Sequence, residues 1–555
     1  LVMLLCQKFC LAFLVLFALV PTIEIVEASA NGGEACAGCT LVLQLLFNLM
    51  AIDEAAFDHV LESYCTTLPE VYAVPCIIFA EQFGEQIIEY IGDDASSDDI
   101  CRALGVCTST TCNLMPSHTG IRPKHQRTFT MPNNNANFLK EYNVWQWLEH
   151  AITQWTSVHD PAIDFDADKF TAITKTMRGN NWRGKDCDAL SDQVYPGRSD
   201  SSFPDAIDQD CNGIYGRDHL ARSYENLYCD GTDRRGVISL GDSATAHFRI
   251  PPQYLTAADI NATTYDHMIY WGLNEADWPH RSWGTGHLND TTTDCAGPLD
   301  SIYLNVYHRN RCNFRDFQNI GVNGARTSSM KPPGIIESMA RNQQTDHKAL
   351  VIFALIGNDV CSGHPDFSHM TTPEEFEENV LESLEYLNST LPAGSFVFMV
   401  GLAQGEVLWN AMYNRTHPIG CTYEELYDYL NCLQISPCWG WMNSNATVRA
   451  ETSIRARQLS AVYNKIIANY SFANFEMAYS DFPLPQAIKI WTEQGGQVYE
   501  LIEPVDGFHP SQIANALLGQ IISDNLIENY PDFIGAVNPN NDLIQQTFGD
   551  QGGYQ

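Results

Sequence analysis

Positive charge is scarce in this sequence of 555 residues. Lys and Arg number 31 against 67 Asp and Glu, which gives a formal net charge of -36. Because a surface of this sign repels a phosphate backbone, we exclude a nucleic-acid partner. Charged residues make up only 18% of the chain and hydrophobic residues 45%, so the chain is not disordered and can build sizeable cores. The acidity favours bound cations, an acidic compartment, or both.

Long hydrophobic runs are also scarce. The unbroken apolar run from Leu11 to Val20 is too short to span a bilayer comfortably, and the small residues Ala28, Ser29 and Ala30 follow it. This pattern predicts a signal peptide over residues 1–30, whereas a buried N-terminal helix leaves the small residues unexplained. We therefore expect a protein that is secreted or held in the lumen of lysosomes or secretory granules. No later run is apolar enough to cross a membrane, so we predict no transmembrane anchor.

Cysteine usage agrees with an oxidising compartment. Of 18 cysteines, Cys6 and Cys10 lie in the predicted signal peptide, which leaves 18 minus 2, or 16, an even number. In such a compartment, N-x-S/T sequons predict glycosylated surface sites. The candidate asparagines are Asn261, Asn289, Asn388, Asn414, Asn445 and Asn469.

Residues 31–112 form a candidate helical domain, in which six cysteines lie between positions 36 and 107. Apolar residues recur at helical spacing, as in Leu43, Leu46, Phe47 and Met50, but spacing alone does not choose among the possible cysteine pairings. The layout resembles the saposin B family, which implies a lipid-binding domain. It also implies the pairs Cys36–Cys107, Cys39–Cys101 and Cys65–Cys76. The alternative is a disulfide-stapled helical module that simply packs on the rest of the chain.

A polar linker follows over residues 113–158. It carries Arg122, Lys124 and Arg127, and it is basic against an acidic background. Exposed linkers of this kind are preferred sites of proteolysis, so either a maturation cleavage or an uncut loop is expected. After a cleavage, Cys112 can hold two subunits together by pairing with a cysteine of the body.

Residues 159–220 contain a dense cluster of acidic residues and no glutamate. Short carboxylates that alternate in loops are typical Ca²⁺ ligands, and oxygen-only ligands favour Ca²⁺ over zinc. The candidate ligands are Asp164, Asp166, Asp168, Phe170, Asp186, Asp188, Asp208, Asp210, Asn212 and Ile214. The segment resembles an aspartate-rich metal-binding repeat, although Lys169 replaces a loop glycine. We expect the separate clusters to complete one another's coordination and Cys187 to pair with Cys211; a solvated acidic loop is the alternative.

Four short blocks carry the candidate chemistry. Ser243 follows a buried strand at 235–240, where a turn into a helix projects the hydroxyl from the sheet edge. Gly324 lies in a loop with accessible backbone N–H groups, and Asn358 ends the apolar strand at 349–356. Asp506 and His509 stand three residues apart, just before an amphipathic helix. Taken separately, each block has a structural alternative: Gly324 in a turn, Asn358 as a strand-end cap and His509 at a helix start.

In order and type these blocks resemble the SGNH, or GDSL-type, hydrolases. The resemblance implies an α/β fold in which residues 231–555 form a three-layer α/β/α flavodoxin-like body. Acyl-transfer chemistry then assigns the roles: Ser243 is the nucleophile, His509 the general acid and base, and Asp506 its partner. The N–H groups of Ser243 and Gly324 and the amide of Asn358 form the oxyanion hole.

The combination of leader, saposin-like head, metal segment and hydrolase body resembles the acyloxyacyl hydrolase family. This resemblance implies removal of secondary fatty acyl chains from the lipid A of bacterial lipopolysaccharide, and maturation into two disulfide-linked subunits. The residues themselves indicate ester hydrolysis beside a lipid-handling module. Two alternatives stay open: a GDSL-type phospholipase or lipase that acts on glycerolipids, and a non-catalytic lipid-binding or transfer protein.

Overall fold

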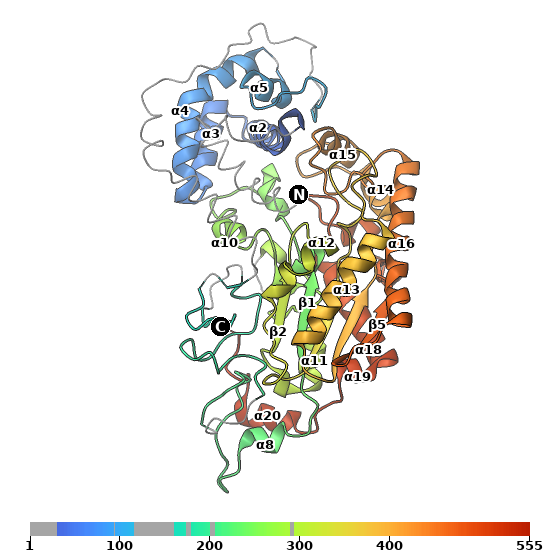
Figure 1. The fold of residues 1–555 in the computed structure, drawn as a ribbon. Helices are drawn as coiled ribbons and strands as arrows, with labels where there is room; N and C mark the ends of the chain where they lie inside the picture. Colours follow the sequence, from blue (N-terminus) through green and yellow to red (C-terminus); the bar gives the residue numbers. More distant parts are fainter. Residues whose placement is uncertain are drawn as a thin grey trace.

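The computed structural model describes residues 30–93, 95–115, 160–161, 163–173, 179–199, 206–288 and 293–554. The predicted signal peptide before Ala30 and most of the linker lie outside the described residues. The described residues form an all-helical head, a segment of loops and an α/β body, which Figure 1 shows in blue, in teal, and in green to red.

The head is a leaf of amphipathic helices closed by disulfides. A short 3-10 turn, η1 (Ala30–Gly32), leads into α2 (Gly33–Asp53), α3 (Phe57–Thr67), α4 (Glu70–Gly92) and α5 (Ser97–Ala103). Disulfides join Cys36 to Cys107, Cys39 to Cys101 and Cys65 to Cys76, the three pairs that the saposin resemblance implies. Such bonds stabilise a domain with a small core, each by about 2 to 4 kcal/mol.

Helix α2 corrects one sequence-based expectation. By length and composition it is apolar enough to cross a membrane, although we expected no such run after the leader. In the structure 61% of its apolar window is buried, and Cys36 and Cys39 bind it to the end of the head. Here α2 is therefore the core helix of the head, whose hydrophobicity serves packing.

The body is built on a five-stranded parallel sheet in the order β2-β1-β3-β4-β5. The strands are β1 (Gly236–Gly241), β2 (Phe317–Gly321), β3 (Ala349–Ala354), β4 (Ser395–Val400) and β5 (Phe475–Ser480). In β1, Ser239 faces Asn319 of β2 and Ile352 of β3. Every residue of the first four strands is buried, as expected for a parallel sheet covered on both faces.

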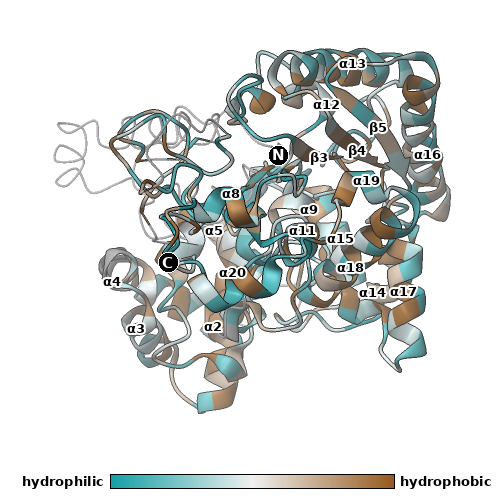
Figure 2. Ribbon diagram, turned by 90° about the horizontal axis from the view of Figure 1, so that it is seen from below, coloured by the Kyte–Doolittle hydropathy of each residue, from teal (hydrophilic) through white to brown (hydrophobic). Residues whose placement is uncertain are grey.

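Helices cover both faces of this sheet. Alternate residues of β3 point to opposite sides: Val351 and Phe353 join the core under α13 (Pro373–Thr390) and α16 (Ala446–Asn469). Leu350 and Ile352 pack instead with α11 (Ile302–Arg309) and α18 (Gln512–Asn529). Figure 2 shows β3 and β4 in brown between the layers. The predicted α/β/α body with flavodoxin-like strand order is confirmed.

Shorter helices complete the body. They are α8 (Tyr224–Tyr228), α9 (Ser243–Ala246), α10 (Met268–Leu273), α12 (Thr327–Met330), α14 (Glu406–Met412), α15 (Tyr423–Cys432), α17 (Leu484–Glu493), α19 (Pro531–Ile534) and α20 (Asn541–Phe548). The 3-10 turns are η2 (Pro252–Tyr254), η3 (Ala257–Asp259), η4 (Pro279–Arg281), η5 (Thr293–Cys295), η6 (Arg311–Asn313), η7 (Ile335–Ser338) and η8 (Val498–Leu501). The described part of the aspartate-rich segment contains none of the named elements and runs as loops along the body.

The head is bonded to the body near α15. Cys112, the candidate tether, forms a disulfide with Cys432 at the end of that helix. The remaining bonds in the described residues are Cys187–Cys211, Cys229–Cys312 and Cys361–Cys438, while Cys295 and Cys421 are free and buried. A cleaved linker would thus leave two chains covalently joined, although the cleavage itself stays a prediction.

Candidate active site

Ser243 is placed by the sharp turn at the end of β1. The strand ends at Gly241, and Asp242 caps the short helix α9 by accepting a hydrogen bond from Ala244 N at 3.0 Å. This geometry sets Ser243 at the carboxyl edge of the sheet, as the sequence predicts. Its side chain is almost buried, with 4% of its surface exposed.

Ser243, His509 and Asp506 meet as a relay. The Nε2 atom of His509 lies 2.7 Å from Ser243 Oγ, and the Nδ1 atom on the other side of the ring is hydrogen-bonded to Asp506 Oδ2. The other Asp506 oxygen accepts the backbone N–H groups of Phe508 at 2.8 Å and His509 at 3.1 Å. Asp506 thereby fixes the imidazole with a proton on Nδ1, which leaves Nε2 free to accept the serine proton.

A buried ion pair between Glu503 and Arg249, which sequence reasoning missed, lies next to the His509 loop. Glu503 is 1% exposed, and its Oε1 lies 2.5 Å from Arg249 Nη1. Its backbone N–H donates to His509 O at 2.8 Å, so the charged pair ties the histidine loop to the chain that follows Ser243. Burial raises the pKa of Glu503, and Arg249 opposes this shift. No spacing rule connects two residues so far apart in the sequence.

Asp242 holds the loop that carries Asn358 next to Ser243. Oδ2 of Asp242 accepts the N–H groups of Ile356 at 2.8 Å and Gly357 at 3.1 Å, which fixes the loop before Asn358. Burial raises the pKa of Asp242 to about 6, although these N–H groups oppose the shift. Asn358 lines one cavity with Ser243 and His509. The structure therefore brings Asn358 to this edge of the sheet, and it shows a contact of Asp242 that sequence reasoning did not consider.

Gly324 lies near this edge but not in the cavity lining. Val322 N donates to Gly241 O at 3.1 Å, so the loop after β2 begins beside the end of β1. Gly324 has a φ of 78°, the left-handed region that favours glycine. Asp359, next to Asn358, accepts the N–H of Thr327 at 3.0 Å and so joins the two loops. An oxyanion role for Gly324 rests on this placement.

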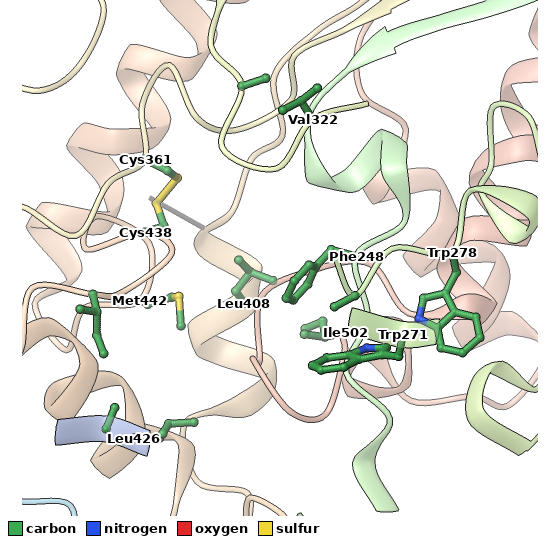
Figure 3. Close-up of a cluster of buried hydrophobic side chains, with 14 of the residues drawn as sticks. Phe248, Trp271, Trp278, Val322, Cys361, Leu408, Leu426, Cys438, Met442 and Ile502 are labelled. Atoms are coloured by element: carbon green, nitrogen blue, oxygen red, sulfur yellow. A yellow bond between two sulfur atoms is a disulfide. The ribbon is translucent and has the colours of Figure 1, made fainter. Parts of the chain in front are cut away.

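A mainly apolar cavity opens at Ser243. The empty space inside it, taken together with open solvent at its mouth, is about 710 Å³. The apolar lining includes Ile356, Leu408, Trp441, Phe482, Leu484, Ile488, Leu501 and Phe508. Figure 3 shows Leu408 and Ile502 in one cluster with Phe248, whose ring centre lies 4.7 Å from that of His509. A long hydrocarbon chain suits such a lining, because its burial removes apolar surface from water.

The first aspartate cluster can accept a metal ion. Carboxylate oxygens of Asp164, Asp166 and Asp168 lie within 4.8 Å of one another. Both oxygens of Asp166 and one of Asp168 are buried and have no hydrogen-bond partner. Burial, together with the neighbouring carboxylates, raises the pKa of Asp168 to about 7 and that of Asp186 to about 6. These residues therefore fit a bound cation, and Lys169 takes a φ of 71° where a loop glycine was expected.

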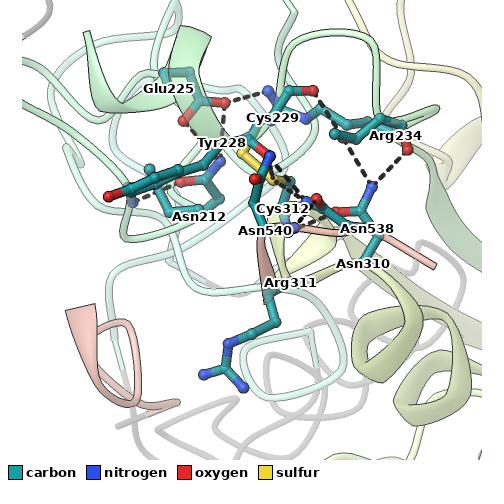
Figure 4. Close-up of a disulfide and its surroundings, with 12 residues drawn as sticks. Asn212, Glu225, Tyr228, Cys229, Arg234, Asn310, Arg311, Cys312, Asn538 and Asn540 are labelled. Carbon is teal, nitrogen blue, oxygen red and sulfur yellow. Dashed lines mark hydrogen bonds and ion pairs between the residues drawn. A yellow bond between two sulfur atoms is a disulfide. The ribbon is translucent and has the colours of Figure 1, made fainter. Parts of the chain in front are cut away.

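The second cluster, Asp208, Asp210 and Asn212, lies next to the positively charged side chain of Arg234. Arg234 forms ion pairs with Asp210 and with Glu225, a residue outside the predicted set (Figure 4). Asn212 Nδ2 donates to Asp210 Oδ2 at 2.9 Å, and one oxygen of Asp208 is buried without a hydrogen-bond partner. Arg234 thus already balances part of the charge that a metal ion would balance.

The other predicted ligands differ in how they are placed. The Phe170 N–H donates to Asp168 Oδ1 at 2.7 Å and the Ile214 N–H to Asn212 Oδ1 at 2.6 Å, which is the local geometry of tight loops. Asp186 is buried near the first cluster, whereas Asp188 is exposed. The Cys187–Cys211 disulfide joins the middle aspartates to the last cluster.

Most sequons in the described residues are accessible. Asn261, Asn414, Asn445 and Asn469 are exposed, whereas Asn388 is half-buried and accepts Asn474 N at 3.2 Å. Asn289 lies outside the described residues. Glycosylation stays a prediction at all six positions.

Two family models match this chain. The GDSL-like lipase/acylhydrolase model matches residues 237–522, and the saposin-like domain model matches residues 35–152. The second match extends past residue 112, where we expected the domain to end. With the relay and the sheet described above, these matches define a lipid-deacylating serine hydrolase that carries a saposin-like head.

Whole-chain relatives narrow this class. Acyloxyacyl hydrolase from Homo sapiens is 40% identical over 557 residues, 95% of this chain and 94% of that protein. The Mus musculus acyloxyacyl hydrolase is 37% identical over 97% of this chain and 96% of its own length. Saposin-C from Cavia porcellus is 28% identical over 13% of this chain and 94% of its own. The chain belongs to the acyloxyacyl hydrolases, so its resemblance to that family is confirmed and it is an esterase.

Proposed function

We propose that this chain removes secondary, acyloxyacyl-linked fatty chains from the lipid A part of bacterial lipopolysaccharide. The observation that carries the proposal is a mainly apolar cavity lined by Ser243 and His509. The names of the relatives support the same bond type. An ester whose acyl part is a long fatty chain suits both.

The proposed mechanism has two acyl-transfer steps. His509 removes the Ser243 proton as the oxygen attacks the ester carbonyl, and then returns this proton to the departing oxygen of the lipid, which leaves as an alcohol. Asp506 stabilises the imidazolium that forms between these transfers. Water, activated by His509, then releases the fatty acid from Ser243. The N–H groups of Ser243 and Gly324 and the Asn358 amide would hold the oxyanion in both steps.

The head would present the lipid to the body. Ile52, Ile77 and Ile88 are exposed on its helices, with 53%, 38% and 41% of their surfaces accessible. Such apolar side chains can receive acyl chains from an aggregate and so lower the cost of withdrawing one lipid. The head then contributes to lipid binding, while the chemistry stays in the body.

Calcium and compartment are parts of the same proposal. The candidate cluster of Asp164, Asp166 and Asp168, with Asp186 beside it, would hold Ca²⁺ and stabilise the loops of that segment. Seven disulfides in the described residues support secretion or the lumen of lysosomes or secretory granules. Cleavage in the linker would give two subunits joined by Cys112–Cys432.

Two comparisons test this function. Fatty acids released from purified lipopolysaccharide and from phosphatidylcholine vesicles should be measured side by side; a higher kcat/KM on phosphatidylcholine would favour the glycerolipid lipase instead. A fluorophosphonate should label Ser243, and its failure to do so would favour a non-catalytic lipid-binding protein.

A further inference from the structure

Three backbone carbonyls of the catalytic loop are held by one neighbouring segment. Tyr423 Oη donates to Pro504 O, His417 Nε2 lies 2.8 Å from Val505 O, and Tyr427 Oη donates to Gly507 O at 2.7 Å. The three carbonyls flank Asp506 on both sides. The loop that carries Asp506 is therefore held directly by side chains of residues 417–427.

All three donors are buried and ordered by their own contacts. His417, Tyr423 and Tyr427 have 2%, 2% and 0% of their surfaces exposed. Nδ1 of His417 accepts the Ile419 N–H at 3.2 Å, so the proton is on Nε2, where Val505 O accepts it. Burial lowers the pKa of His417 to about 4, so the ring is neutral. Because the three donor side chains are buried, these bonds are costly to lose.

The fit around Gly507 leaves the loop little room to shift. Gly507 has a φ of 63°, and a Cβ atom there would lie 2.4 Å from the hydroxyl oxygen of Tyr427. On its other side, the Gly507 N–H donates to Glu503 O at 2.9 Å. The backbone between Asp506 and His509 is thus held between Tyr427 and the buried Glu503 turn.

The same segment carries the head. Tyr429 Oη donates to Thr40 Oγ1 of α2 at 3.0 Å, and Cys432 is bonded to Cys112. Asn48 of α2 donates to Ile419 O at 3.0 Å. Residues 417–432 therefore contact both the head and the catalytic loop. Figure 1 shows α15 at the end of the body that lies next to α2.

We propose that His417, Tyr423 and Tyr427 are positioning residues that fix Asp506 and His509 against Ser243. The proposal rests on the catalytic role of that pair, and not on which lipid is cleaved. A displacement of a catalytic group by a fraction of an ångström lowers the rate without weakening substrate binding. The segment acts on any ester, including a short one that needs no lipid surface.

The test uses 4-nitrophenyl butyrate, a short ester. In the Tyr423→Phe/Tyr427→Phe variant both rings remain and only the two hydroxyl donors are lost. We expect kcat to fall about tenfold or more with KM within about twofold of wild type. The matched control is Tyr463→Phe, because Tyr463 is fully buried and its hydroxyl has no partner among the described residues. This control should keep the wild-type kcat.

A second readout separates positioning from general stability. In the double variant the acid limb of the kcat/KM pH profile should move, because the surroundings of His509 change; a purely structural loss scales the profile without moving it. His417→Gln retains an amide donor for Val505 O and should recover most of the activity that His417→Leu loses. If the double variant does not fold, Tyr427→Phe alone decides by the same kcat criterion.

The outcomes distinguish this inference from the proposed function. A double variant with kcat within about twofold of wild type and an unmoved pH profile overturns the positioning role. If Ser243→Ala retains full activity on the same ester, the catalytic assignment fails first. A loss of activity in Ser243→Ala together with a tenfold loss in the double variant supports the catalytic assignment and the positioning role.

Discussion

Replacing Asn358 by alanine tests the oxyanion hole with little risk to the fold. The Asn358 side chain has 8% of its surface exposed and lines the cavity beside Ser243 and His509. Among the described residues its side-chain amide has no hydrogen-bond partner in the protein. Its loop is held instead by the carboxylates of Asp242 and Asp359, which the substitution leaves in place.

The expected magnitude follows from the loss of one donor to the oxyanion. Such a loss typically lowers kcat by about 10² to 10³, or about 2.7 to 4 kcal/mol of transition-state stabilisation. Because the amide acts on the charged intermediate, KM should change by less than about threefold. Since no native hydrogen bond is lost, the thermal midpoint should stay within about 2 °C of wild type.

The assay is steady-state hydrolysis of 4-nitrophenyl butyrate, with the thermal midpoint measured on the same preparations. Asn323→Ala is an informative comparison, because Asn323 Nδ2 donates to Asp277 Oδ2 at 2.9 Å in a buried setting. That variant should lose stability. If Asn358→Ala keeps kcat within about fivefold of wild type, or raises KM in proportion to the loss, Asn358 does not bind the oxyanion.

Three further predictions concern the relay, the cavity and the metal segment. Asp506→Asn should lower kcat by about 10⁴, because an amide selects the wrong His509 tautomer; a loss below tenfold in the same steady-state assay would contradict the relay. Leu408→Trp should fill part of the cavity and lower kcat/KM for a 4-nitrophenyl ester of a long fatty acid more than for the butyrate, and equal losses would move the acyl site elsewhere. Chelation of Ca²⁺ should lower the thermal midpoint more at pH 7.5 than at pH 5. The reason is the raised pKa of Asp168, about 7. At pH 5 the carboxyl group is protonated, so the cluster is stable without a cation. As the pH rises through about 7 the group loses its proton, and the cation-free protein loses this stability. Equal midpoints with and without chelator at pH 7.5 would argue against a structural calcium ion.

The fold was largely predictable because its signals are local. Apolar runs such as 349–356 read as strands buried on both faces, and Ser243 follows another of them. The order and type of the four blocks then predicted that Asp506 and His509 lie at the same edge of the sheet as Ser243. In the head, the spacing of six cysteines resembled one family closely enough to imply the pairs that the structure contains.

The parts that sequence reasoning missed depend on long-range contacts. Nothing in the spacing indicates that Cys112 pairs with Cys432, or that Glu503 meets Arg249. Tyr427 is one aromatic residue among many on an amphipathic helix, and only the fold brings its hydroxyl to Gly507 O. Sequence reasoning also overlooked how apolar α2 is: a helix buried within a small domain can be as apolar as a membrane span.

The most direct test of the central claim is mass spectrometry of the fatty acids freed from purified lipopolysaccharide by wild type and by Ser243→Ala. Wild type should release the secondary acyl chains and leave the primary chains in place, while the alanine variant releases neither. Equal release by the two proteins, or release of primary chains at the same rate, would contradict the assignment of Ser243 and its cavity to this reaction.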